Sequence, residues 1–381
     1  MVIYLDCNST TPVDSRVQEE ILRYLAVEFG NAGSTTHEYG ERARRAVHRA
    51  RDQIGAVVGV LRHEIIFTSG ATESNNLAIL GLAPHGEQAG KRHIVSTQIE
   101  HKAVLEPLEV LARRGFEITL VPPNTGGWVE ADAVCAAVRS DTLLVSIMQV
   151  NNETGVRQPI DEIAGRLADL PVFLHVDAAQ GFGKELRPLA HPRIDLISIS
   201  GHKIYGPKGI GALVVRRRGF ELPPLSPLMY GGGQELGLRP GTLPVHLIVG
   251  LGKAAELAHT EHAARIEQCK EYRRQLLQGL SPLAPRLHGD PARMLPHVVN
   301  LSFPSLDAEQ TIGALRDFVA ISDGAACTST CATASHVLTA MGLPCEQVEG
   351  AVRFSWSHNS ELPDLHRIRS SLLARIAERG T

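Results

Sequence analysis

The feature that most constrains this chain is the alternation of short apolar runs with helical patterns over its first two-thirds. Seven runs rich in β-branched and apolar residues are predicted as strands: 64–67, 93–96, 117–121, 142–148, 172–176, 195–199 and 212–215. Most are separated by amphipathic stretches that are predicted as helices: 38–58, 73–82, 102–114, 129–139 and 160–169. The alternation predicts an α/β fold, with helices on both faces of a mostly parallel sheet. Ligands of such sheets bind at the carboxyl ends of the strands.

The last third of the chain follows a different pattern. The 381 residues are more than one core usually serves, so we expect two domains. A helical pattern over 244–279 predicts one long helix, which Gly250 and Gly252 would bend, leading into a second domain that begins near residue 257. Two further strands and a loop of small, polar residues are predicted after it: 297–303, 351–356 and 321–335.

Charge and composition exclude several kinds of partner. The formal net charge is -3 and there is no long basic run, so direct nucleic-acid binding is not expected. The most apolar stretch, 143–150, is far too short to cross a bilayer, and the first residues lack the pattern of a signal peptide. The six cysteines contain no C-x-x-C pair and form no disulfide framework. We therefore expect a cytoplasmic protein with no membrane segment and no metal site.

Polar residues follow the predicted strands at the edge that a parallel sheet brings together. After 64–67, the sequence SGATESNN predicts a Gly-rich turn and a helix that begins near Thr72 and Ser74, which suits a phosphate group. The later strand ends supply His101, Lys102, Asn151, Asn152, Asp177, Gln180, Ser200, His202 and Lys203. Pyridoxal phosphate needs such a set, namely a lysine for a Schiff base, an acid for the ring nitrogen and an anion site.

Each of these residues alone has a more ordinary interpretation. Lys203 by itself is more often a solvated loop residue, Asp177 a helix cap and His101 a core or surface histidine. The glycines around Lys203 form neither a P-loop nor a dinucleotide-binding motif. The convergence of all these groups on one sheet edge, in chain order, favours the cofactor site.

Longer motifs resemble those of a known family. SGATESNN, EHKAV, VNNETG, HVDAAQ, SGHKIYGPKG and RPGTLPVH together resemble the pyridoxal-phosphate-dependent cysteine desulfurases of the class V aminotransferase superfamily, from residue 3 to about residue 356. The segment after Cys327 is similar in length to the branch that serves iron–sulfur assembly. The resemblance implies aminotransferase fold type I, with a seven-stranded, mostly parallel sheet domain over 14–256. It also implies a smaller α+β domain, made of 1–13 and 257–381, that carries the catalytic cysteine.

The resemblance also implies roles for individual residues. Lys203 would hold the cofactor as a Schiff base, and His101 would stack on its ring and shuttle protons. Asp177 would contact the ring nitrogen of the cofactor, Gln180 its ring hydroxyl, and Asn152 would also contact the cofactor. The phosphate would be held by Ala71, Thr72, Ser200 and His202 of one subunit and by Thr242 of the partner subunit. The substrate L-cysteine would be held by Asn31, Asn152 and Arg353, the last as a bidentate clamp on the carboxylate. The chain would thus be a homodimer.

Cys327, in the sequence CTS, stands where the family keeps its nucleophile. Its thiolate would attack the sulfur of L-cysteine, leaving alanine and a persulfide on Cys327 for transfer to an acceptor. A buried structural thiol is the ordinary alternative, but the neighbours are Gly, Ala, Ser and Thr rather than a packed apolar stripe. Cys331 could relay sulfur or pair with Cys327, although a bystander role is commoner for such a thiol, as for Cys345.

The chain departs from the common family pattern at a few positions. Asp323 and Ala325 replace two serines before the nucleophile, and Cys7 replaces a more usual tyrosine. A negative charge at Asp323 would oppose formation of the Cys327 thiolate. These changes resemble the desulfurases that supply sulfur for DNA backbone phosphorothioation. The near-neutral charge favours a sulfur-acceptor protein over DNA itself as the partner.

Two other classes of function are compatible with the sequence. One is another pyridoxal-phosphate enzyme, such as a selenocysteine lyase or an aminotransferase, which would form a different product from L-cysteine. The other is a non-catalytic scaffold in which Cys327 and Cys331 hold a metal or a cluster. The scaffold would keep its colour without Lys203, whereas the enzyme would not.

Overall fold

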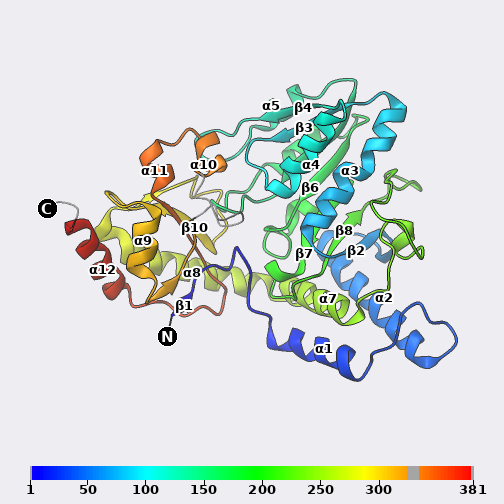
Figure 1. Cartoon of the computed structure of the whole chain (residues 1–381), viewed down its shortest axis with the longest axis horizontal. Helices are drawn as coiled ribbons and strands as arrows, with labels where there is room; N and C mark the ends of the chain where they lie inside the picture. Colours follow the sequence, from blue (N-terminus) through cyan, green and yellow to red (C-terminus); the bar gives the residue numbers. More distant parts are fainter. Residues whose placement is uncertain (1, 324–333, 379–381) are drawn as a thin grey trace.

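A seven-stranded sheet forms the centre of the larger part of the molecule (Figure 1). The computed structural model describes residues 2–323 and 334–378. The strands are β2 (Ile65–Thr68), β3 (His93–Thr97), β4 (Glu117–Val121), β5 (Thr142–Met148), β6 (Phe173–Asp177), β7 (Leu196–Ser200) and β8 (Gly211–Val215). Their spatial order is β2-β8-β7-β6-β5-β3-β4. β8 is antiparallel to both neighbours and the other pairs are parallel, which confirms the predicted mostly parallel sheet.

Side chains alternate between two cores on the two faces of the sheet. Ile65 and Phe67 of β2 face the core formed with α2 (Glu38–Val58), α5 (Ala131–Ala136), α6 (Ile160–Arg166) and α7 (Val245–Thr260). Ile66 faces the core formed with α3 (Ala71–Ala89) and α4 (Lys102–Arg113). Because both faces are covered, β5 is buried along its whole length and consists mainly of apolar residues.

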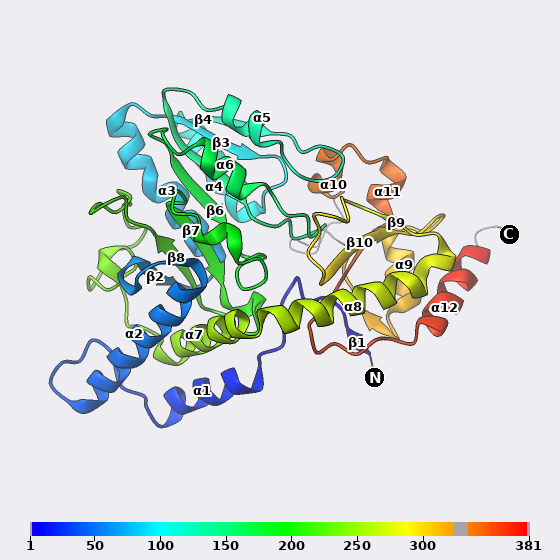
Figure 2. The same ribbon diagram turned by 180° about the vertical axis from the view of Figure 1, so that it is seen from behind.

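The helical pattern over 244–279 forms two helices rather than the one predicted. α7 ends at Thr260 and α8 (His262–Leu280) follows after Glu261, so the break in the helical pattern lies at Glu261 and not at Gly250 or Gly252. Both glycines lie inside α7, where a Cβ at Gly252 would come 2.7 Å from the Cα atom of Ala50. They allow α7 to pack closely against α2 and α1 (Ser15–Ala26), a helix absent from the predictions. Figure 2 shows α7 and α8 running from the large sheet to the smaller part of the molecule.

The smaller part of the molecule has its own sheet and core. β10 (Val298–Ser302) is antiparallel to both β9 (Arg286–Leu287) and β12 (Ala351–Ser355), and β1 (Ile3–Tyr4) is parallel to β11 (Val319–Ala320). A separate apolar cluster joins Leu5 to residues of α8, α9 (Ala308–Leu315), β10, β12 and α12 (Leu365–Ala377). This separate core supports the division into 14–256 and 1–13 with 257–381, which stays a proposal.

The predicted loop at 321–335 is described only at its two ends. Ser322 forms a β-bridge with Arg353, and α10 (His336–Ala340) begins directly after Ser335, followed by α11 (Cys345–Glu349). Cys327, Cys331 and Ala325 lie outside the described residues.

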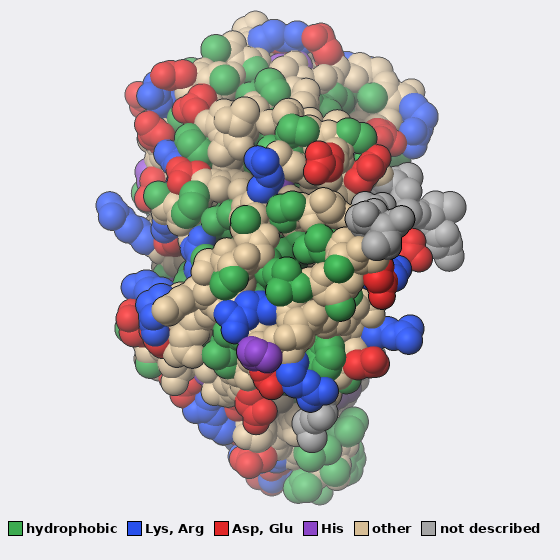
Figure 3. Space-filling view, turned by 90° about the vertical axis from the view of Figure 1, so that its left-hand side faces the viewer, with side chains coloured by type: hydrophobic (Ala, Val, Ile, Leu, Met, Phe, Trp, Pro, Cys, Tyr) green, Lys and Arg blue, Asp and Glu red, His purple; other side chains and the backbone are tan. Residues whose placement is uncertain are grey.

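The surface charges and the character of the helices can be compared with the expectation of no nucleic-acid binding and no membrane segment. Figure 3 shows acidic and basic side chains interspersed on the face at the smaller end of the molecule. Within the described residues, no helix combines the length and apolar character needed to cross a membrane.

Candidate active site

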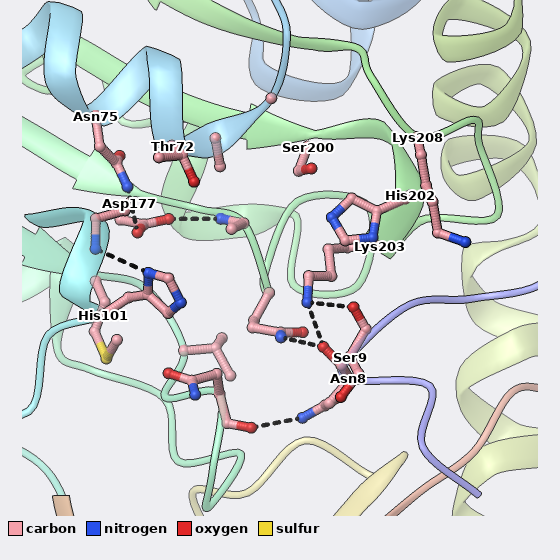
Figure 4. Close-up of a pocket in the computed structure, with 18 of the residues that line it drawn as sticks. Asn8, Ser9, Thr72, Asn75, His101, Asp177, Ser200, His202, Lys203 and Lys208 are labelled. Atoms are coloured by element: carbon pink, nitrogen blue, oxygen red, sulfur yellow. Dashed lines mark hydrogen bonds between the residues drawn. The ribbon is translucent and has the colours of Figure 1, made fainter. Parts of the chain in front are cut away.

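A cavity of about 540 Å³ lies at the carboxyl ends of the sheet strands, as predicted (Figure 4). Its floor is formed by the ends of β5, β6 and β7, and its walls by the starts of α3 and α4, by Asn8 and Ser9 of the N-terminal segment, and by Arg353 of β12. The cavity brings together ten of the predicted site residues: Ala71, Thr72, His101, Asn152, Asp177, Gln180, Ser200, His202, Lys203 and Arg353.

The start of α3 forms one end of the cavity. The helix begins at Ala71, one residue before Thr72, and its N-cap is Gly70 rather than Thr72 or Ser74. Among the described residues no side chain caps this end, and Ser200 and His202 line the cavity. The first N–H groups of a helix lack intrahelical partners and carry the positive end of its dipole. This end of the cavity therefore suits a phosphate group.

Two details keep the start of α3 open. The Glu73 carboxylate accepts from the Ser69 N–H at 2.7 Å and from Arg239 Nε at 3.0 Å. Because these two contacts partly neutralise the charge of Glu73, the carboxylate repels an anion at the helix start less strongly. A Cβ at Gly211 of β8 would come 2.6 Å from the Cα atom of Gly70. Glycine at position 211 thus lets the turn lie directly against the sheet.

Asp177 ends β6 and points into the cavity (Figure 4). One carboxylate oxygen accepts from Asn75 Nδ2 at 2.8 Å and the other from the Ala179 N–H at 2.9 Å. Asn75 lies on the buried face of α3 and was missed by sequence reasoning. A usable signal existed, because two polar residues, Ser74 and Asn75, occupy buried positions of an otherwise apolar helix face.

Lys203 lies in a short 3-10 turn, Gly201–Lys203, directly after β7. Its ammonium group donates to the carbonyl oxygens of Asn8 and Ser9, the latter at 2.9 Å. These two residues come from the N-terminal segment and were not predicted. The glycine at 201 is needed for the turn, since a Cβ there would come 2.9 Å from the Pro207 carbonyl oxygen.

The two histidines of the site differ in their surroundings. His101 caps α4, with Nδ1 accepting from the Ala103 N–H at 3.0 Å, which places the proton of the neutral ring on Nε2. Burial, followed by the charges of Lys203, Lys208 and Lys184, lowers the pKa of His202 to about 4. His202 is therefore neutral at physiological pH, and the lysines around it favour an anionic ligand.

Arg353 is fully buried in the wall of the cavity. Nη1 donates to the Asn152 carbonyl oxygen at 2.9 Å, and Nη2 donates to Asp6 Oδ1 and Ser9 Oγ, both at 2.8 Å. The side chain is 1% exposed, and its Nε has no hydrogen-bond partner within the described residues. The contacts fix the arginine between the N-terminal segment and the end of β5.

Besides Arg353 Nε, three buried side-chain oxygens of cavity-lining residues have no hydrogen-bond partner among the residues that the structure describes: Asn8 Oδ1, Asn75 Oδ1 and Gln180 Oε1. Gln180 is held at its other end, because Nε2 donates to the Asn8 carbonyl oxygen at 2.9 Å. Buried polar groups are rarely left unpaired in folded proteins. These atoms therefore fit a polar ligand in the cavity.

Other predicted residues lie elsewhere. Asn31 and Thr242 are exposed and do not line this cavity. Cys327 lies outside the described residues. Over 2–323 and 334–378, no group of His, Cys, Asp or Glu side chains has the arrangement of a metal site.

Comparison with known proteins identifies the family. Residues 3–368 match the description of class-V aminotransferases. The chain belongs to the class-V aminotransferase family. Within this family it is similar to proteins named cysteine desulfurase IscS. It is 45% identical to that of Pectobacterium carotovorum over 93% of this chain and 87% of the relative. It is 46% identical to that of Escherichia coli over the same shares.

Solved structures of similar chains agree with this family. The crystal structure of DndA from Streptomyces lividans is 52% identical, with a TM-score of 0.82 over 93% of this chain and 99% of that one. A structure described as SspA in complex with cysteine is 36% identical, with a TM-score of 0.81 over 93% and 98% of the two chains. The class-V aminotransferase fold inferred from the sequence is thus confirmed.

Proposed function

We propose that this chain is a cysteine desulfurase that uses pyridoxal phosphate to convert L-cysteine to L-alanine, leaving a persulfide on Cys327. The observation that carries the proposal is the meeting of Lys203, Asp177 and the uncapped start of α3 in one cavity. The similarity to proteins named cysteine desulfurase supports the choice of reaction.

The residues of the cavity fit the cofactor at each of its polar groups. Lys203 would hold it covalently and Asp177 would pair with the ring nitrogen. Gln180 Oε1, which has no hydrogen-bond partner among the described residues, would contact a ring substituent. The phosphate would lie at the start of α3, among Ala71, Thr72, Ser200 and His202. When bound, pyridoxal phosphate supplies an electron sink that makes the carbon–sulfur bond of the substrate labile.

The chain's own residues would then bind the substrate and move its protons. Arg353 and Asn152 line the cavity and would orient the carboxylate of L-cysteine. His101, with its proton on Nε2, would exchange a proton with the substrate. The Cys327 thiolate would take the substrate sulfur, so that one S–S bond forms as the C–S bond breaks and a proton completes alanine.

A homodimer is part of this proposal. Several large apolar side chains are exposed in the segment that precedes Thr242, including Phe220 (96% exposed), Tyr230 (86%) and Leu236 (61%). Exposed apolar patches of this kind mark contact surfaces. A second copy of the chain would cover them and bring Thr242 of the partner subunit to the phosphate.

The persulfide would pass to a sulfur-acceptor protein in the cytoplasm. The acceptor would belong to iron–sulfur assembly or to DNA phosphorothioation. Incubation of persulfide-loaded protein with a purified acceptor of each pathway, with labelled sulfur, distinguishes them by the acceptor that becomes labelled.

Two variants test the reaction and the roles. Cys327→Ser should keep the colour of the bound cofactor and lose persulfide formation, whereas Lys203→Ala should lose the covalent attachment itself. The measurements are the absorbance spectrum and the alanine formed from L-cysteine. A keto acid in place of alanine would indicate transamination, and normal sulfur delivery by Cys327→Ser would overturn the nucleophile assignment.

A further inference from the structure

Helix α10 packs directly against the wall of the active-site cavity. Val337, Leu338 and Met341 form an apolar cluster with Ile99 and Met148, and Met148 itself lines the cavity. The helix is only five residues long, so its own hydrogen bonds give it little stability. Its position therefore depends on the contacts that it makes with the large sheet.

Two polar contacts fix the start of α10. Ser335 Oγ accepts from the Leu338 N–H at 3.1 Å as the N-cap, and it donates to Glu153 Oε2 at 2.5 Å. His336 Nε2 donates to the carbonyl oxygen of Glu100, the residue before His101, at 3.0 Å. Both contacts reach residues that are adjacent in sequence to residues of the cavity.

Glu153 is a rigid acceptor for the Ser335 hydroxyl. Its backbone is held by Asn151, whose Oδ1 accepts from the N–H groups of Glu153 at 2.9 Å and Thr154 at 3.0 Å. Asn151 Nδ2 in turn donates to the Ile99 carbonyl oxygen at 3.1 Å. Glu153 is 3% exposed, so water competes little for its carboxylate.

The same wall holds the chain on the other side of the predicted nucleophile. Ser322 and Arg353 exchange backbone hydrogen bonds, with the Arg353 N–H donating to the Ser322 carbonyl at 2.7 Å. The Arg353 guanidinium group contacts the Asn152 carbonyl, one residue from Glu153. Cys327 lies between Ser322 and Ser335 in the sequence. Both described flanks of this part of the chain are thus attached to the substrate end of the cavity.

We propose that Glu153 is a positioning residue for sulfur transfer, because it accepts the Ser335 hydroxyl and so fixes the start of α10 against the cavity wall. The inference rests on the proposed desulfurase function and deepens it. Glu153 is not among the cavity-lining residues, so it acts through Ser335 rather than on the substrate.

The charges around Glu153 decide which variants are informative. Burial raises the pKa of its carboxyl to about 7, the Ser335 hydroxyl, Arg353 and His101 lower it, and Asp323 raises it. Positioning needs only an oxygen acceptor, which a glutamine also provides. Glu153→Gln should therefore keep the hydrogen bond from Ser335 and remove the titratable carboxyl group, whereas Glu153→Ala removes both the hydrogen bond and the carboxyl group.

The test compares four variants of the cofactor-loaded full chain. We expect Glu153→Ala and Ser335→Ala to lower the turnover of L-cysteine to alanine by about tenfold, which corresponds to the loss of one hydrogen bond. The KM for L-cysteine should stay within roughly twofold, since the wall itself is intact. Glu153→Gln should restore turnover. Ser371→Ala is the matched control, because it removes a 2.7 Å hydrogen bond from Ser371 in α12 to the Ala314 carbonyl in α9, and its turnover should equal the wild type.

The outcomes separate the inference from the function on which it rests. Wild-type protein that forms no alanine would overturn the desulfurase function and the inference with it. Wild-type protein that forms alanine, with Ser335→Ala and Glu153→Ala equally active, would overturn the positioning role alone. A rise in KM without loss of turnover would also contradict it. A Ser335→Ala variant with unchanged thermal unfolding and reduced turnover supports it even if Glu153→Ala fails to fold.

Discussion

At the scale of single residues, Asp177 shows how a charge can be held ready for a ligand. Its two oxygens accept from neutral donors, the Asn75 side chain and the Ala179 N–H, and the described residues form no ion pair with it. A carboxylate held in this way keeps its negative charge available for a protonated ring nitrogen.

Asn75→Ala should therefore weaken cofactor binding. Loss of one hydrogen bond to a buried carboxylate is worth about 1.5–3 kcal/mol, so the dissociation constant should rise by about tenfold or more. Absorbance titration of cofactor-free protein with pyridoxal phosphate measures it. Asn76→Ala is the control, since Asn76 Nδ2 donates only to the Thr72 carbonyl, and equal affinities of the two variants would contradict the role of Asn75.

Glu100 is a second buried acid, next to His101. Its side chain is inaccessible, with Oε1 accepting from Thr97 Oγ1 at 2.7 Å and from the Met148 N–H at 3.0 Å. Burial raises the pKa of its carboxyl to about 8, and the charge of Asp177 adds to this effect. Glu100 is therefore protonated in the folded chain at neutral pH.

The proton on Glu100 should make the folding stability of the protein depend on pH. Because the folded pKa lies above the unfolded value of 4.5, the folded state binds more protons between pH 4.5 and 8, and Glu100 destabilises it increasingly over that range. Glu100→Gln removes this loss. Its melting temperature minus that of the wild type should rise from pH 5 to pH 8, and a difference independent of pH would contradict the assignment.

The residue types at the strand ends could be read from sequence, and those contributed by other elements could not. Asp177, His202 and Lys203 follow apolar runs, so the parallel sheet predicts that they meet. Asn75 is on a helix face, and Asn8 and Ser9 arrive from the far end of the chain. Their place in the site depends on packing between distant segments, which no local pattern records.

At the scale of elements, the central strands were predictable because they are apolar over their whole length. The helices were predicted less well, as the long helical pattern over 244–279 shows. No glycine or proline marks the break at Glu261, while the two glycines that suggested a bend serve close packing. A glycine inside a helix thus indicates either a bend in that helix or close packing against another helix. The two can be distinguished only when the position of the neighbouring helix is known.

Gly252→Ala should destabilise the fold for this reason. The added Cβ would meet the backbone of Ala50, which cannot rotate away, so we expect a loss of about 1–3 kcal/mol. Chemical denaturation measures it. Gly313→Ala in α9 is the matched control, because a Cβ there meets nothing within 4 Å and should stabilise by up to about 1 kcal/mol. Equal effects would show that packing at Gly252 is not tight.

At the scale of the whole molecule, the cavity joins segments from both parts of the chain. Lys203 and Asp177 come from the large sheet, whereas Asn8 and Arg353 come from the smaller part. Lys203 and Arg353, the residues proposed to attach the cofactor and to bind the substrate carboxylate, thus lie on different parts, which meet through the contacts of Lys203 with Asn8 and of Arg353 with Asn152.

The proposed homodimer can be tested at the same scale. Phe220→Asp combined with Tyr230→Asp places two charges on the exposed apolar segment and should yield monomers with weaker cofactor binding. Sedimentation measures the mass. Leu373→Asp on α12, a residue that is 54% exposed, is the control and should leave the assembly unchanged. A dimer that survives the double substitution would place the interface elsewhere.

The pairing of the first strand with the last third of the chain has a consequence for biosynthesis. Leu5 packs among residues 269–372, and the Asn8 N–H donates to Ser355 Oγ at 2.9 Å. During synthesis, residues 5–8 must therefore wait until residue 355 has been made before they find their neighbours. Until then the nascent chain lacks one wall of the cavity, so a ligand that needs this wall can bind only after that stretch has been synthesised.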